Sequence, residues 1–205
     1  MNEPSFERLL IATGNKGKVA ELADLLRPVG RPLVTLADFP TIVAPEETGT
    51  TFADNAAIKA VYYAQAFGEW VIADDSGLEI DHLDGAPGVY SARFGGTDSS
   101  YEEKMALVLS GLNNVDDRSR TARFVCVVKV ADSVGNIVIA AGGICEGLIA
   151  HAPRGTNGFG YDPIFIPDGF DRTFGELSDE EKRSISHRGK ASADLIRKML
   201  DFTGV

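Results

Sequence analysis

The sequence feature that most constrains this chain is an apolar run that leads directly into two adjacent carboxylates. Val71 to Ala73 predict the end of a buried strand, Asp74-Asp75 follows at once, and Ser76-Gly77 predicts a turn. Adjacent carboxylates repel, and burial disfavours their charged forms further. A divalent cation removes both penalties, and carboxylate oxygens suit Mg²⁺. The stretch therefore predicts either a metal and catalytic site at a strand end or a strand end capped by a turn.

Composition and charge limit the classes of protein that need to be considered. The chain has 205 residues, of which 44% are hydrophobic and 24% charged, which is typical of a globular protein of one domain or two small lobes. The net charge of -10, with no basic tract, argues against a general nucleic-acid or anionic-membrane binder. A local lysine cluster or a metal still allows a small anionic substrate.

The two cysteines and the pattern of apolar segments favour a reducing compartment over a secreted or membrane-bound location. Cys126 and Cys145 are isolated within apolar runs, which predicts buried free thiols of a reducing cytosol. No signal peptide or transmembrane run is visible. We therefore expect a cytoplasmic protein with no membrane partner.

A glycine loop near the start of the chain has the order strand, loop, helix. Arg8 to Ala12 predict a strand, and Thr13-Gly14-Asn15-Lys16-Gly17-Lys18 precedes a helical apolar pattern. Backbone N–H groups and the helix dipole favour an anion there. Val19 stands where a P-loop kinase or ATPase needs Ser or Thr, which argues against that class. A solvated turn is the alternative.

The middle of the chain predicts one helix with a polar face and a mixed sheet. Thr51 and Asp54 predict a helix start, and Asn55 and Lys59 share one face of that helix, either lining an anion site or facing solvent. Further strands are expected at 31–36, 78–83, 120–131 and 136–144, the last two as a hairpin, with a helix from Ser100 to Leu112. Antiparallel strands beside helix-connected strands predict an α/β architecture with an added lobe.

The last third of the chain carries a glycine-aromatic loop and a cluster of donors. Phe159-Gly160-Tyr161-Asp162 places aromatic rings and an acid among glycines, which suits stacking on a base and reading its edge. Lys182, in a short helix expected to begin with a capping box at Ser178 and Glu181, and His187-Arg188 add donors. A plain turn into a strand and a helix junction are the alternatives.

Taken together, these stretches resemble the inosine/xanthosine triphosphate pyrophosphatases, which remove non-standard purine nucleotides from the nucleotide pool. Seven matching pieces occur in the family's order between about residues 8 and 200: 13–18, 46–49, 51–60, 73–78, 85–88, 158–163 and 186–189. The resemblance implies a single α/β domain over residues 1–205, with a long central mixed sheet, flanking helices and two lobes around a nucleotide-binding cleft. It also implies a homodimer and Mg²⁺-dependent hydrolysis of ITP, dITP, XTP and dXTP to the monophosphate and pyrophosphate.

The resemblance also implies roles for individual residues. Asp75 is expected to bind metal and accept the proton of the attacking water, with Lys18 and Lys59 as further catalytic residues. Glu46 is the expected second metal ligand, with Glu47 left open as its substitute, and Asp74 supports the metal shell. The residues expected to bind substrate are Thr13, Gly14, Asn15, Lys16, Gly17, Lys18, Ser76, Phe159, Gly160, Tyr161, Asp162, Lys182, His187 and Arg188. Arg188, which only donates, is expected to favour a purine with a keto oxygen.

Two alternatives to this function stay open at the level of sequence. One is a related nucleotide pyrophosphatase with another base preference, such as modified pyrimidines. The other is a nucleotide-sensing module that binds without turnover. Asp75 and Glu46 favour catalysis, because a sensor needs no group to activate water.

Overall fold

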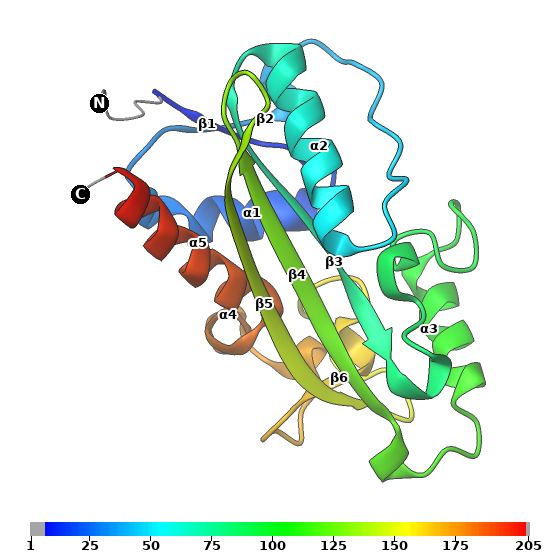
Figure 1. Ribbon diagram of the computed structural model, residues 1–205. Helices are drawn as coiled ribbons and strands as arrows, with labels where there is room; N and C mark the ends of the chain where they lie inside the picture. Colours follow the sequence, from blue (N-terminus) through cyan, green and yellow to red (C-terminus); the bar gives the residue numbers. More distant parts are fainter. Residues whose placement is uncertain (1–6, 204–205) are drawn as a thin grey trace. The chain divides into compact units, whose positions relative to one another are not determined.

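The computed structural model describes residues 7–203, which form a six-stranded mixed sheet with five α-helices (Figure 1). The strand order is β2-β1-β3-β4-β5-β6, with β1 parallel to β2 and β3, and β6 antiparallel to β5. The strands are β1 (Leu9–Ile11), β2 (Leu33–Thr35), β3 (Trp70–Ile80), β4 (Thr121–Ala131), β5 (Ile137–Ile149) and β6 (Phe165–Pro167). The predicted α/β class with a central mixed sheet is therefore confirmed.

The helices begin close to where local sequence signals predict them. They are α1 (Lys16–Leu25), α2 (Phe52–Phe67), α3 (Tyr101–Gly111), α4 (Asp179–Ile185) and α5 (His187–Thr203). Thr51 caps α2, and capping boxes open α3 at Ser100 and α4 at Ser178, as predicted. Within the described part of the chain, no helix is long and apolar enough to cross a membrane.

The described residues divide into two compact units, each assembled from separate stretches of sequence. The first unit contains residues up to Asp75, residues 126–143 and residues from Arg188 onward; the second contains residues 76–125 and 144–187. We describe each unit by itself. The predicted cleft between two lobes stays a prediction.

In the first unit, buried side chains lie on both faces of the sheet. On one face, Ile72 of β3 packs in a cluster with residues of α1 and α5. On the other face, Val71 and Ala73 of β3 pack with residues of α2. Side chains alternate between the two faces along a strand, so each position of β3 is directed either toward α1 and α5 or toward α2.

The structure contradicts the predicted strand end at the acidic pair. β3 does not stop at Ala73 but continues through Asp74-Asp75 and Ser76-Gly77 to Ile80, and only 81–83 form a short 3₁₀ turn. The predicted turn and the predicted separate strand at 78–83 are therefore wrong. The physical reason is alternation: adjacent acids on one strand point to opposite faces, so they do not compete for one location.

The second unit has its own core. Leu78 and Ile80 of β3 pack with apolar residues of α3. Phe124, Phe165 and Phe174 lie in the same cluster, where the ring of Phe124 is 4.7 Å from that of Phe165 and 5.9 Å from that of Phe174. This aromatic packing supports the segment that follows β5, where the glycine-aromatic loop lies.

The predicted hairpin and the predicted free thiols are both confirmed. β4 and β5 are joined by a turn in which the Asp132 N–H donates to the Asn136 carbonyl at 2.9 Å. β5 runs past its predicted end at Ile144. Cys126 and Cys145 are buried and free, and burial is the main cause that raises the pKa of the Cys126 thiol to about 12.

Candidate active site

The predicted phosphate loop lies between β1 and the start of α1. Asn15 caps α1: its Oδ1 accepts from the Lys18 N–H at 3.1 Å, and the Asn15 N–H lies 3.3 Å from Thr13 Oγ1. The first turn of α1 carries no acidic residue, so no carboxylate of that turn competes for the positive end of the helix dipole. The second half of the predicted loop is already helical, because α1 begins at Lys16, whose side chain is exposed. The geometry suits an anion at the helix N-terminus.

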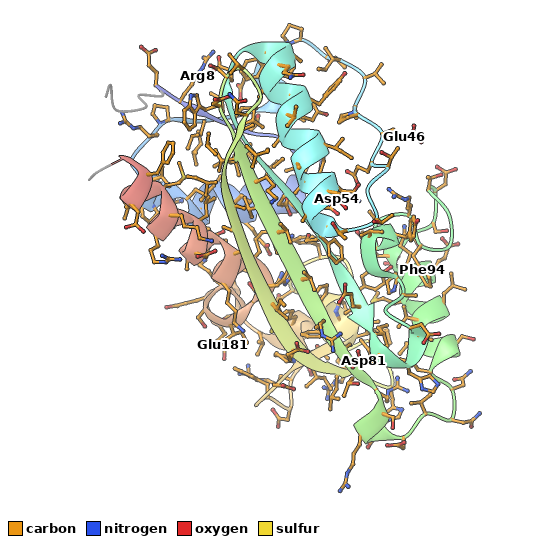
Figure 2. The ribbon with its side chains drawn as sticks, viewed as in Figure 1. Arg8, Glu46, Asp54, Asp81, Phe94 and Glu181 are labelled. Carbon is orange, nitrogen blue, oxygen red and sulfur yellow. The ribbon has the colours of Figure 1, made fainter. Side chains whose placement is uncertain are left out.

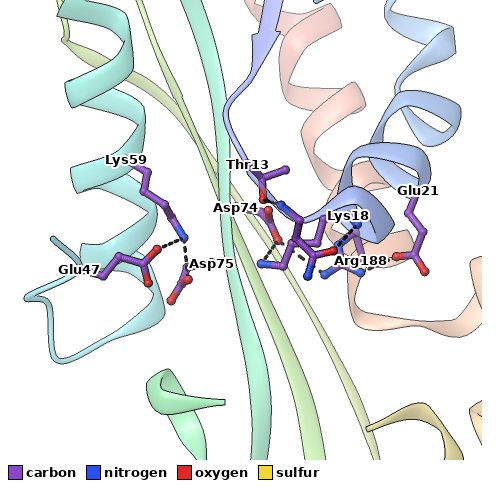
Figure 3. A network of polar contacts seen from close by, with 9 residues as sticks. Thr13, Lys18, Glu21, Glu47, Lys59, Asp74, Asp75 and Arg188 are labelled. Carbon is purple, nitrogen blue, oxygen red and sulfur yellow. Dashed lines mark hydrogen bonds and ion pairs between the residues drawn. The ribbon is translucent and has the colours of Figure 1, made fainter. Parts of the chain in front are cut away.

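Asp74 lies on the α1 and α5 side of β3 in a buried cluster of four charged residues, here called the Asp74 cluster (Figure 3). Lys18 Nζ lies 2.9 Å from Asp74 Oδ2, and Arg188 Nη2 lies 3.6 Å from the same oxygen. Arg188 also forms an ion pair with Glu21 of α1. Burial alone raises the pKa of Asp74, but the cations, led by Lys18 and Arg188, outweigh it and hold the pKa well below its ordinary value. Asp74 is therefore an ionised carboxylate that forms ion pairs with Lys18 and Arg188.

Asp75 lies on the α2 side of the same strand, in a second group called the Asp75 cluster: Glu47, Lys59 and Asp75. Lys59 Nζ lies 2.8 Å from Asp75 Oδ1 and 3.0 Å from Glu47 Oε1 (Figure 3). The other oxygen of Asp75, Oδ2, is buried and has no hydrogen-bond partner among the described residues. Burial, aided by the charge of Glu47, raises the pKa of Asp75 above its ordinary value against the pull of Lys59. Asp75 thus has one oxygen without a hydrogen-bond partner among the described residues and an increased affinity for a proton.

The charge balance of the two clusters decides which one fits a metal. In the Asp74 cluster two cations face two carboxylates, whereas in the Asp75 cluster one lysine faces two carboxylates. No group of three or more His, Cys, Asp or Glu side chains that could hold a metal is found among residues 7–203. Mg²⁺ does not require such a cage, since it binds through one or two carboxylates plus waters and substrate phosphates. The two carboxylates and the open oxygen of the Asp75 cluster therefore fit Mg²⁺.

The structure does not bring together the three predicted metal ligands. Asp74 and Asp75 are directed to opposite faces of β3, and Glu46 lies exposed on the segment beside α2 (Figure 2). Among the described residues, the Glu46 side chain has no hydrogen bond or ion pair, whereas Glu47 reaches Lys59. Of the two glutamates that the sequence left open, Glu47 is the one that the structure places with Asp75.

The predicted base-binding loop lies in the second unit, where two of its residues meet Lys182 of α4. Asp162 accepts from the Phe159 N–H at 2.7 Å and from Lys182 Nζ at 2.8 Å, and Lys182 Nζ lies 4.9 Å from the centre of the Phe159 ring. A Cβ at Gly158, where φ is +73°, would lie 2.0 Å from Asp162 Oδ2, so this turn requires glycine. Gly160 also has a positive φ, of +70°. The arrangement fixes one aromatic ring beside a buried acid-lysine pair.

The remaining predicted substrate residues have other contacts. The Tyr161 hydroxyl is buried and donates to the Ser91 carbonyl at 3.0 Å. The His187 ring is buried and stacks on Phe124 at 4.6 Å. Ser76 is partly buried within β3. Arg188, expected at the base, has its ion pairs in the Asp74 cluster; its role in reading a base stays a prediction.

Two residues of the site were missed at the level of sequence. Glu21 pairs with Arg188 and lies three positions after Lys18 on α1, a spacing that places the two on one helix face and that was available as a signal. Phe124, which packs on His187, lies in a strand far away in the sequence and carried no local signal.

Fold and site together define a class: an α/β protein with a glycine loop at the start of a helix and acid-lysine clusters on opposite faces of the strand next to it. The family model described as "Ham1 family" matches residues 9–198, and the chain belongs to the Ham1 family. A dITP/XTP pyrophosphatase of Desulforamulus reducens is 52% identical, over 90% of this chain and 91% of that protein, and one of an Exiguobacterium species is 49% identical, over 95% and 98%.

Solved structures agree with this membership. A HAM1 protein from Coxiella burnetii superposes with a TM-score of 0.86 at 40% identity, covering 95% of this chain and 98% of that one. The Staphylococcus aureus Ham1 protein gives a TM-score of 0.84 at 37% identity, with the same coverage of the two chains.

Proposed function

We propose that this protein hydrolyses the non-standard purine nucleoside triphosphates ITP, dITP, XTP and dXTP to the monophosphate and pyrophosphate. Relatives that match nearly the whole chain are named dITP/XTP pyrophosphatases, which supports this reaction. The observation that carries the proposal is the geometry of Asp75: Oδ1 is held by Lys59, and Oδ2 has no hydrogen-bond partner among the described residues. A general base needs an oxygen that is free to accept the proton. Hydrolysis would remove these nucleotides before they are incorporated into DNA or RNA.

In the proposed mechanism, the chain holds the triphosphate and deprotonates a water. The backbone N–H groups at the start of α1 and the ammonium of Lys18 bind the phosphates. Asp75 accepts the proton of the attacking water through Oδ2, while Lys59 holds Oδ1 and so fixes the direction of the carboxylate. Mg²⁺, bound by Asp75 and Glu47 or Glu46, would supply charge neutralisation on the phosphates.

The proposed base site uses the loop of the second unit. Phe159 stacks on the purine, and Lys182 and Asp162 hold that ring and offer polar contacts to base and sugar. Backbone and side-chain donors, among them His187 and Arg188, favour the keto oxygen of hypoxanthine and xanthine over the amino group of adenine. We also propose that the enzyme acts in the cytoplasm, which its buried free cysteines support, and as a homodimer, which rests on the family resemblance.

A panel of nucleotides tests this function. With Mg²⁺ present, each nucleoside triphosphate is supplied in turn and pyrophosphate and orthophosphate are measured separately. We expect pyrophosphate from ITP, dITP and XTP and little from ATP or modified pyrimidine nucleotides. In ¹⁸O-water, the label should appear in the monophosphate. Preferred turnover of a pyrimidine would identify the related pyrophosphatase instead, and binding without turnover would identify a sensing module.

A further inference from the structure

Residues 43–49, which include Glu46 and Glu47 and are here called the acidic segment, are attached to one face of α2. Asn55, Lys59 and Tyr62 occupy positions i, i+4 and i+7 of this helix, which place their side chains in one row. Each of them contacts the segment. Asn55 Oδ1 accepts from the Gly49 N–H at 2.8 Å, and Lys59 Nζ lies 3.0 Å from the Glu47 carboxylate. The Tyr62 hydroxyl donates to the Val43 carbonyl at 2.7 Å. The segment therefore runs antiparallel to α2 and is held at three points.

The contact at Asn55 differs from the other two because the helix side chain that makes it is fully buried. Asn55 is 0% exposed, and its Oδ1 accepts the Gly49 N–H. A Cβ at Gly49 would lie 2.7 Å from this oxygen and 2.5 Å from the Cβ of Asp54, so the backbone approaches α2 as closely as only glycine allows. This attachment therefore holds the backbone of the segment directly against the buried side of α2.

The buried amide of Asn55 also lowers the stability of the folded protein, and this needs an explanation. Its Nδ2 is buried and has no hydrogen-bond partner among residues 7–203. A buried donor left without a partner is destabilising, whereas an apolar side chain of similar shape avoids this penalty. An amide at this position is therefore poor for stability alone, and its Oδ1 is the part that makes a contact.

Glu47 is only two residues from the Gly49 anchor, and the chain between them is bent. The Thr48 N–H donates to the Glu46 carbonyl at 3.1 Å, an i→i+2 hydrogen bond that turns the backbone at Glu47. A fixed Gly49 and a tight turn leave the Glu47 carboxylate little freedom. Without the anchor, the position of Glu47 would depend on side-chain contacts such as its partly exposed ion pair with Lys59, and such pairs hold geometry weakly.

We propose that Asn55 is a positioning residue that holds the acidic segment against Lys59 and Asp75, so that a glutamate of the segment is in place for Mg²⁺ before substrate binds. This inference rests on the proposed function, because it concerns the metal that the reaction uses. Groups that orient metal ligands typically change metal affinity or activity by about 10–100-fold when removed. We expect an effect of that size on Mg²⁺ dependence.

The test compares two variants that each remove one attachment of the same segment. Asn55→Leu keeps the shape of the side chain and removes the acceptor for Gly49, while Tyr62→Phe removes the hydrogen bond to Val43 four residues away from Glu47. Amide hydrogen exchange of the metal-free protein is followed by mass spectrometry on overlapping peptides across 43–50. Asn55→Leu should speed exchange at 47–49, and Tyr62→Phe at 43–45 only.

The second measurement is Mg²⁺ itself, by calorimetric titration of the protein without nucleotide and by the Mg²⁺ midpoint of pyrophosphate release from ITP. Asn55→Leu should weaken Mg²⁺ binding by about 10–100-fold, whereas Tyr62→Phe should change it by less than about twofold. A general loosening of the segment would weaken Mg²⁺ binding in both variants. Asn55→Asp, which keeps an oxygen facing Gly49, should retain the slow exchange at 47–49 and serves if the leucine variant does not fold.

Three results would overturn the inference: unchanged exchange in Asn55→Leu, faster exchange with unchanged Mg²⁺ affinity, or equal weakening of Mg²⁺ by Tyr62→Phe. A wild-type protein that binds Mg²⁺ but releases no pyrophosphate would refute the proposed function alone. The role of Asn55 would then still be decided by exchange and calorimetry.

Discussion

Asp74 and Asp75 are neighbours in the chain, yet their surroundings give them opposite chemistry. Asp74 meets two cations and its pKa is lowered; Asp75 shares one lysine with Glu47 and its pKa is raised. The difference arises because one residue of strand separates the α1 and α5 face of β3 from the α2 face. The comparison shows that Asp74 serves as a buried counter-ion, whereas Asp75 is suited to accept a proton.

The largest expected effect is on turnover at Asp75. Asp75→Asn keeps the shape of the side chain but accepts no proton, so kcat should fall by about 10²–10⁴. Lys59 keeps Glu47 as a partner, and the asparagine needs no buried charge, so the melting temperature should not fall. Pyrophosphate release and thermal unfolding, measured on the same preparation, check this. Near wild-type turnover in the folded variant would remove Asp75 from its proposed role.

The corresponding change at Asp74 should act on stability. Asp74→Asn leaves Lys18 and Arg188 without their shared carboxylate in a buried setting. Removing one partner of a buried ion pair typically costs about 3–5 kcal/mol of unfolding free energy. Urea unfolding of the variant beside wild type measures the loss. A free energy of unfolding equal to that of Asp75→Asn would erase the distinction between the two clusters.

The two glutamates of the acidic segment sharpen the comparison on the α2 side. Glu47 contacts Lys59, whereas the Glu46 side chain is exposed. If Glu47 is the second carboxylate of the metal site, Glu47→Gln should raise the Mg²⁺ midpoint by about 10–100-fold and Glu46→Gln by less than about threefold. Titration of Mg²⁺ at saturating ITP decides between them. The reverse ranking would mean that the segment rearranges when metal and nucleotide bind.

The smallest expected effect is on the pH dependence of the unfolding free energy. Asp74→Asn and Asp75→Asn should change this dependence in opposite directions. The folded-state pKa of Asp74 lies below the ordinary value of 3.8, so its stabilisation is present above that value and is lost as the pH falls toward the folded-state pKa. The folded-state pKa of Asp75 is raised, so its ionisation opposes folding at neutral pH, and that penalty is relieved as the pH falls.

The unfolding free energy of wild type should therefore be higher than that of Asp74→Asn at neutral pH. This difference should become smaller below about pH 4. Asp75→Asn should be at least as stable as wild type at neutral pH. Urea unfolding at several pH values follows both differences. A gap for Asp74→Asn that does not change with pH would show that its carboxylate is not ionised in the folded protein.

Local signals in the sequence predicted the elements that are determined locally. The helix starts at Thr51, Ser100 and Ser178 follow from side chains that bond the backbone within three residues. The acidic pair was harder to predict, because the strand continues through two acids that are each paired with a lysine, one on each face of the strand. Lys18 and Lys59 lie far from Asp74 and Asp75 in the sequence, so that pairing is a property of the fold.

Arg188 shows the same limit at the level of the site. Its neighbour His187 and the nearby Lys182 suggested a single donor cluster around a base. The structure places Asp162, an ion-pair partner of Lys182, in the second unit and Glu21 and Asp74, ion-pair partners of Arg188, in the first. A sequence pattern groups residues by their spacing along the chain, whereas ion pairs form between elements whose spacing no local pattern records.

The continuity of β3 through Asp74-Asp75 has a consequence for insertions and deletions. Deleting or adding one residue between Trp70 and Asp74 shifts every later side chain of the strand to the opposite face. After a deletion, Asp75 would take the position of Asp74 and face Lys18, and Ser76 would take the place of the carboxylate proposed to be catalytic; after an insertion, Asp74 would take that place instead. A change of two residues restores the parity of the faces. In this part of the gene, tolerance to length variation should therefore depend on whether the number of residues is odd or even.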